Sequence, residues 1–184
     1  YSLRFYRNIC INKYGDELGN VLHAVHTDIE RYASVYDKML AHQFIFHGDP
    51  AVRVNPHARP DFVITPATIQ FEPDIINSTI ETFTLKVITT NIGRTQSGFY
   101  TIQVERILPD GQVEVYEQTV NTPNFKDTTY FEIPTNRALG LGLNTFNIKV
   151  DYHNEYNEMS ENNNEVTISK IFLSDDIVPV FPSE

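Results

Sequence analysis

The feature that most constrains the fold of this chain is a change of hydrophobic period at residues 42–64. In residues 16–32, before this seam, apolar residues recur every three or four positions, as on one face of an amphipathic helix. In residues 83–152, after it, apolar and polar residues alternate, as in half-buried strands. The seam contains an apolar run, a turn and two breaking prolines: Phe44-Ile45-Phe46, Gly48-Asp49-Pro50, Pro56 and Pro60. The sequence therefore predicts two structural units that meet at this seam.

The part before the seam is predicted to be helical and incomplete. Helices are expected at residues 16–32 and 34–43, followed by a short strand at residues 51–54. Two helices and one short strand do not close a hydrophobic core by themselves. We therefore expect this part to need a partner sheet, which the sequence does not contain before residue 61.

The part after the seam is predicted to be a β-sandwich. Pro109-Asp110-Gly111 is typical of a tight hairpin turn. The glycine-containing run at residues 139–143 is followed by neither a helix nor a lysine, so it predicts a loop between strands rather than a phosphate-binding loop. Candidate strands lie at residues 68–72, 83–87, 102–107, 113–120, 128–133, 146–152 and 165–173. Short strands with turns about every ten residues predict an immunoglobulin-like antiparallel β-sandwich.

Charge and composition limit the partners of the chain. Residues 1–60 hold seven Lys and Arg against six Asp and Glu, whereas residues 61–184 hold seven against eighteen. Such an acidic second part would repel phosphate backbones, so no nucleic-acid partner is expected. No apolar run approaches the roughly 20 residues that span a bilayer. The single cysteine, Cys10, permits no internal disulfide.

Two stretches of the first part resemble the end of the catalytic domain in gingipain-like cysteine peptidases. They are Gly15-Asp16-Glu17-Leu18-Gly19-Asn20-Val21-Leu22 and Phe44-Ile45-Phe46-His47-Gly48-Asp49-Pro50-Ala51-Val52-Arg53-Val54. In that family a helix and a strand of this pattern close a caspase-like α/β domain, and an immunoglobulin-like domain follows. The resemblance covers about 40 residues. It implies that the family's nucleophile and base lie upstream of the helix matched here.

The second part resembles a CARDB module, a cell-adhesion-related β-sandwich of bacterial surface proteins. The resemblance rests on Asn91-Ile92-Gly93 with Ser97-Gly98, and on Val150-Asp151 followed by the acidic loop Glu158-Met159-Ser160-Glu161-Asn162-Asn163-Asn164. It implies a structural role for the sandwich at a cell surface or in a secreted protein.

Together these patterns predict a mainly β chain with three segments. Residues 1–57 are expected to be the helical C-terminal remnant of a caspase-like α/β peptidase domain, and residues 58–173 an immunoglobulin-like, CARDB-type sandwich. Residues 174–184 would start a following module or linker. The chain is expected to be non-catalytic and to support or space the peptidase domain of its parent polypeptide, or to mediate surface adhesion. The alternative is a free-standing module that binds a surface protein or a glycan.

Three sets of residues are candidates for chemistry. Cys10 could act as a nucleophile, but its apolar neighbours Ile9 and Ile11 favour a buried structural residue, so no catalytic residue is assigned. His23, His26 and Glu30 could hold zinc, although they match no known zinc motif and are better explained as ordinary helix-surface residues.

The acidic loop is the third candidate. Asp151, Glu155, Glu158 and Glu161 supply the hard oxygen ligands that Ca²⁺ prefers, but their spacing does not match an EF-hand. The alternative is that these side chains and the neighbouring asparagines hold a tight turn between strands. No other cofactor is expected.

Overall fold

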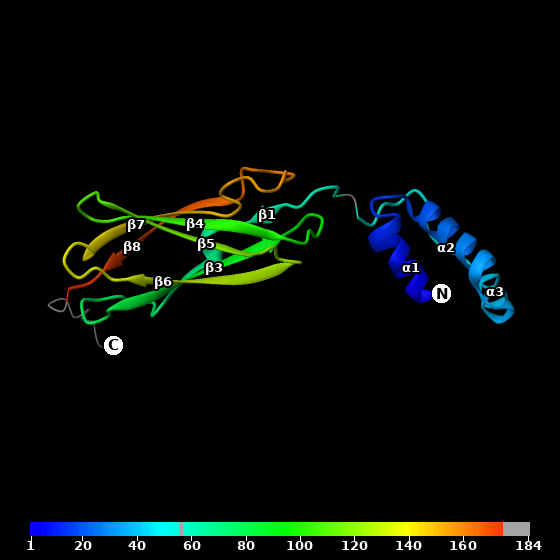
Figure 1. Ribbon diagram of the computed structural model, residues 1–184, viewed down its shortest axis with the longest axis horizontal. Coiled ribbons are helices and arrows are strands. Elements are labelled where there is room, and N and C mark those ends of the chain that lie inside the picture. Colours follow the sequence, from blue (N-terminus) through cyan, green and yellow to red (C-terminus); the bar gives the residue numbers. More distant parts are fainter. Residues whose placement is uncertain (56, 175–184) are drawn as a thin grey trace, which may run out of the picture. The chain divides into compact units, whose positions relative to one another are not determined.

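The structure, a computed structural model, describes residues 1–55 and 57–174. Two compact units make up the chain, Tyr1–Ala58 and Arg59–Glu184. Each has its own hydrophobic core. We call the two the helical unit and the sandwich unit, and Figure 1 shows the elements of both. The predicted start of a following module at residues 174–184 lies, apart from Ser174, outside the described residues. Within those described ranges, no helix is long and apolar enough to cross a membrane.

The helical unit contains both helices that the sequence predicts. Its elements are α1 (Ser2–Arg7), the π-helical turn η1 (Asn8–Asn12), α2 (Leu18–Tyr32) and α3 (Val35–Ala41). The apolar stripe of α2 is buried as its period requires, through Val21, Val25 and Ile29. Helix α3 starts after Ser34 because the Ser34 hydroxyl oxygen accepts the backbone N–H of Asp37 at 3.3 Å. The sequence analysis assigned no element to residues 1–12.

The strand predicted at residues 51–54 is wrong. Only one isolated antiparallel bridge forms there, between Arg53 and Glu17. The segment instead satisfies the free N–H groups at the start of α2, because Leu18 donates to the Val52 carbonyl and Gly19 to the Pro50 carbonyl, both at 2.8 Å. These bonds replace the side-chain cap that α2 lacks.

The sandwich unit is built from two antiparallel sheets. Its elements are β1 (Phe62–Val63), the 3₁₀ turn η2 (Pro66–Thr68), β2 (Ile69–Glu72), β3 (Thr82–Asn91), β4 (Phe99–Ile107), β5 (Val113–Asn121), β6 (Lys126–Pro134), β7 (Gly142–Lys149) and β8 (Glu165–Phe172). In the first sheet β3 pairs with β6 along one edge and with β2 and then β1 along the other. The second sheet has the order β5-β4-β7-β8.

The topology confirms the predicted fold class. The chain changes sheet between β3 and β4, between β5 and β6, and between β6 and β7, which is the Greek-key pattern of immunoglobulin-like sandwiches. The glycine-containing run at residues 139–143 connects β6 to β7, as expected of a loop between strands. All seven predicted strands form, and among the described residues the short β1 is the one strand that the sequence did not predict.

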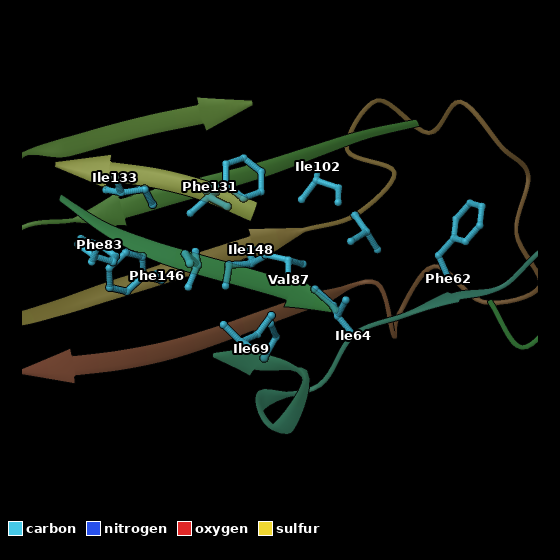
Figure 2. Close-up of a cluster of buried hydrophobic side chains, with 14 of the residues drawn as sticks. Phe62, Ile64, Ile69, Phe83, Val87, Ile102, Phe131, Ile133, Phe146 and Ile148 are labelled. Atoms are coloured by element: carbon cyan, nitrogen blue, oxygen red, sulfur yellow. The ribbon is translucent and has the colours of Figure 1, made fainter. Parts of the chain in front are cut away.

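The core between the sheets follows from the alternation of the strands (Figure 2). β3 contributes Phe83, Leu85 and Val87, each at most 1% exposed, while β7 contributes Phe146 and Ile148 from the facing sheet. Burial of these side chains is the main stabilising contribution in a sandwich of this size.

One core position carries a charge. Arg106 of β4 is fully buried and lies over the rings of Phe83, Phe146 and Phe172, with the guanidinium carbon 4.9 Å from the Phe172 ring centre. Each of its three side-chain nitrogens donates a hydrogen bond: Nε to Asn144, Nη1 to Glu114 and the Pro134 carbonyl, and Nη2 to the Thr135 carbonyl. Arg106 follows Ile102 and Val104 on the inward face of β4 because the side-chain period of a strand is two residues.

Candidate functional site

The residues behind the CARDB resemblance meet at one end of the sandwich. They lie around residues 59–64, the first residues of the sandwich unit, which we call the incoming segment. The loop after β3 (residues 92–98) bonds it on one side, and the loop from β7 to β8 (residues 150–164) on the other. We call the whole arrangement the anchor site.

Asn91, the last residue of β3, organises the first side of the anchor site. It is 3% exposed, and its Oδ1 accepts the backbone N–H of Asp61 at 3.2 Å and of Gly93 at 3.0 Å. The loop itself adds two backbone bonds, from Ile92 to the Asp61 carbonyl at 2.9 Å and from Arg94 to the Arg59 carbonyl at 2.8 Å.

Gly93 is required here by close approach rather than by an unusual backbone angle. A Cβ atom at this position would lie 2.3 Å from the Arg59 carbonyl oxygen and 2.8 Å from the Asp61 nitrogen. Any side chain would therefore push the incoming segment off the loop. This gives a physical reason for the glycine in the Asn91-Ile92-Gly93 motif.

The loop from β7 to β8 provides the second side of the anchor site. Glu158 Oε2 accepts the backbone N–H of Phe62, and the Met159 N–H donates to the Pro60 carbonyl at 2.9 Å. Asn163 makes two contacts, since its Nδ2 donates to Asp61 Oδ1 at 2.7 Å and its carbonyl accepts the Ile64 N–H at 3.0 Å. The incoming segment is thus bonded along its whole length.

Asp151 shapes the first turn of this loop. It is fully buried and has a φ of 51°, a left-handed conformation that Asp tolerates better than most residues. Its carboxylate accepts the N–H groups of Glu155 at 2.9 Å and of Tyr156 at 3.1 Å. The Tyr156 ring then packs edge-on against Phe62, with the ring centres 5.7 Å apart.

Glu158, Glu161 and Asn164 form the second turn. Glu161 accepts the Glu158 N–H at 3.2 Å. The Asn164 side-chain amide nitrogen donates to one oxygen of each carboxylate, Glu158 Oε1 and Glu161 Oε2, at 3.2 Å in both cases. Glu158 and Asn164 are buried, whereas Glu161 is exposed to solvent.

Burial shifts the acidity of this loop. Desolvation raises the pKa of Glu158 to about 7, and the charges of Asp151 and Glu161 add to the shift because both neighbours are acidic. Desolvation also raises the pKa of Asp151 to about 7, helped by a hydrogen bond with Glu155. At Glu155, burial acts to raise the pKa, but hydrogen bonds to Asp151 and Thr101 lower it. The net result is a pKa below the ordinary value for Glu. Asp151 and Glu155 thus form a carboxyl pair in which Asp151 is the more readily protonated partner.

The structure brings the four calcium candidates together only in pairs. Asp151 lies with Glu155, and Glu158 lies with Glu161 around Asn164. Within residues 1–55 and 57–174, no three His, Cys, Asp or Glu side chains form a group that could hold a metal ion. Calcium binding by these residues stays a prediction. The hydrogen bonds support the alternative role of these side chains in holding a turn.

The other candidates lie in the helical unit. The expectation of a buried Cys10 is wrong, because its thiol is exposed. The turn η1 points Ile9 inward, at 9% exposure, while Cys10 and Ile11 face out. Of the zinc candidates, Glu30 lies with its Oε1 3.1 Å from Nε2 of His42.

Sequence reasoning named the two motifs of the anchor site but not what they bind. The polar residues of the incoming segment, Arg59 and Asp61, lie in the seam at residues 42–64, which by sequence is only a junction between two units. The burial of Glu158 has no sequence signal, because the same residue in a polar loop is usually exposed.

No protein-family model and no curated protein matches this sequence. Solved structures of similar fold include the CARDB domain of a Pyrococcus furiosus protein in complex with di-metal ions, at 22% identity and a TM-score of 0.44, over 69% of this chain and 99% of that one. A domain described as part of a cell surface protein from Methanosarcina acetivorans matches at 24% identity and a TM-score of 0.43. The match covers 62% of this chain and 92% of that one. The β-sandwich described above rests on its own strand order and register.

Proposed function

We propose that the sandwich unit is a non-catalytic support module that anchors the chain entering it. The observation that carries this proposal is the hydrogen bonding of residues 59–64. Backbone groups of all six positions, with Val63 in strand β1, are bonded by the two flanking loops or by β3. A segment bonded in this way does not move independently of the sandwich, so the preceding part of the polypeptide is attached at a fixed point.

Hydrogen exchange on the full chain tests the anchor. The amides of Asp61, Phe62 and Ile64 should exchange at rates near those of the core strands, because each donates to a buried or bonded acceptor. In an Asn91→Ala variant these amides should lose at least tenfold in protection. Asn121→Ala, a change at an exposed position of the edge strand β5, is the matched control and should leave them protected. Wild-type exchange as fast as that of an open turn would overturn the proposal.

The surface or secreted location is part of the same proposal. Its support is that the residues of the CARDB-like motifs, Asn91, Gly93, Asp151 and Glu158, are those that build the anchor site. Labelling of intact source cells with an impermeant reagent and an antibody to this chain is the test. Detection only after lysis would exclude a surface location.

The finer part of the proposal concerns the parent protein. The helical unit would be the end of an α/β domain, as the gingipain-like motifs imply, and its missing sheet would come from the rest of the parent polypeptide. In support, the unit has an apolar cavity of about 400 Å³ lined by side chains including Phe5, Leu22 and Phe44, and Ile45 beside it is 76% exposed. A His and a Cys in the peptidase pattern upstream of Tyr1 in the gene are expected, and their absence would refute the peptidase parent.

A further inference from the structure

Strand β6 is an open edge of the first sheet, since among the described residues it pairs with β3 alone. Two backbone bonds flank this ladder: Asn91 donates to the Phe125 carbonyl at 2.7 Å, and Thr135 donates to the Glu81 carbonyl at 2.8 Å. Both pairs continue the β3–β6 register, and bonded pairs alternate with non-bonded pairs along an antiparallel ladder. The odd-numbered residues of β6 therefore bond β3, and the N–H and C=O groups of the even-numbered residues point to the open edge.

The even-numbered residues carry side chains that complement a second copy of the same strand. They lie on the outer face of the sheet and are Lys126, Thr128, Tyr130 and Glu132. If two β6 strands pair antiparallel about Thr129, Lys126 of each lies opposite Glu132 of the other, and each Thr128 lies opposite a Tyr130. Pairs of opposite charge and pairs of an aromatic with a β-branched residue stabilise a sheet. Moving the centre by one residue in either direction brings no opposite charges together.

Both charged residues are available for this contact. Lys126 is exposed and forms no ion pair with any described residue. Glu132 is exposed, and its Oε1 accepts the Thr84 hydroxyl at 2.7 Å, so its other oxygen can still accept a lysine. One N–H of the open edge is occupied, because Thr128 donates to Oδ1 of Asp127 at 2.8 Å. Asp127 is exposed and can turn to water when Thr128 bonds a second copy.

The open edges of the second sheet lack this complementarity. The outer residues of β5 include Glu117 and no basic residue, and those of β8 include Glu165 and no basic residue. Pairing either strand with a copy of itself would bring no opposite charges together. Of these edges, β6 is therefore the one that fits a second copy of the chain.

We propose that two copies of this chain associate through their β6 strands, antiparallel and centred on Thr129, so that the first sheet of one sandwich continues into that of the other. Each opposed pair of even-numbered residues exchanges two backbone hydrogen bonds. The contact involves one strand of each copy and is smaller than a standard interface. The dimer is therefore weak and reversible, with a dissociation constant on the order of 10⁻⁵ M. This association goes beyond the proposed support role and uses no residue of the anchor site.

Sedimentation equilibrium of the full chain at low salt tests the dimer, because salt screens exposed ion pairs. Wild type should pass from monomer to dimer between about 10⁻⁶ and 10⁻³ M. Lys126→Glu brings two glutamates together at each end of the strand pair, and Glu132→Lys brings two lysines together. Each variant alone should therefore dimerise about tenfold or more weakly than wild type. An equimolar mixture of the two should recover association, because the lysines of one chain then face the glutamates of the other.

Glu117→Lys is the matched control. Like Glu132, Glu117 is an exposed outer residue of an edge strand and accepts a neutral donor, Nε2 of Gln103 at 2.8 Å. The variant changes the net charge as Glu132→Lys does and should dimerise as wild type does. A wild-type chain that stays monomeric at about 10⁻³ M would overturn the proposal. So would Lys126→Glu and Glu132→Lys variants that dimerise as wild type does, or a mixture of the two that stays monomeric.

Discussion

The protonation of Glu158 should make the stability of the sandwich depend on pH. Its pKa is raised from the ordinary 4.5 to about 7 by desolvation, so the folded state favours the neutral carboxyl. The stabilisation from the bound proton is complete below pH 4.5 and is lost as pH rises through 7. A difference of about 2.5 pKa units corresponds to about 3 kcal/mol, of which about 2.5 kcal/mol is lost between pH 5 and pH 8.

Replacement of Glu158 by Gln removes this contribution while keeping the size and one acceptor of the side chain. The Gln oxygen can accept the Phe62 N–H, and its amide can donate to Asn164 Oδ1 after rotation of that side chain. The variant should therefore be as stable as wild type at pH 5 and about 2.5 kcal/mol more stable at pH 8.

Urea denaturation at pH 5, 6, 7 and 8 in the presence of chelator measures this difference. The decline of the unfolding free energy with pH should be smaller in Glu158→Gln by about 2.5 kcal/mol. Part of the decline should remain, because the pKa of Asp151 is raised in the same direction. Glu81→Gln should keep the full wild-type decline, since that side chain is exposed. A Glu158→Gln variant with the wild-type pH dependence would refute the assignment of a neutral buried carboxyl at this position.

Three further predictions follow from the contacts of single side chains. Asn91→Ala removes the acceptor of two backbone N–H groups, including that of Asp61, and should lower the unfolding free energy by about 2–3 kcal/mol in urea denaturation. Arg106→Met removes the cationic partner of Glu114 and the donor to the Pro134 and Thr135 carbonyls, and should cost about 3–5 kcal/mol; a loss below 1 kcal/mol would show that the charge is dispensable. Cys10 should react fully with a thiol reagent in the native chain, and slow reaction limited by unfolding would contradict its exposure.

The strands of the sandwich could be predicted because alternation reports burial directly. In β3 the same period that identifies the strand also selects Phe83, Leu85 and Val87 as core residues. The period also placed Arg106 inward, but a charged residue at such a position looks like a break in the pattern. Its burial depends on acceptors that lie 8 to 38 residues away, in β5, β7 and the β6–β7 loop.

In the helical unit, local sequence patterns predicted one element correctly and another wrongly. The stripe of Val21, Val25 and Ile29 predicted α2 correctly, since helical period is a local property. The alternation at residues 51–54 predicted a strand that does not form, because a strand needs a partner and the backbone there bonds the start of α2 instead. Exposure of Cys10 likewise depends on which side of η1 meets the rest of the unit.

For the anchor site, the sequence by itself determined which residues are unusual: a glycine two residues after Asn91, and an acidic loop rich in asparagine. Only the tertiary structure decided what they do. Asp61 and Glu158 are 97 residues apart in sequence, and hydrogen bonds around the incoming segment bring them to the same place. Their bonding and the raised pKa of Glu158 arise from burial by distant parts of the chain, which no local pattern encodes.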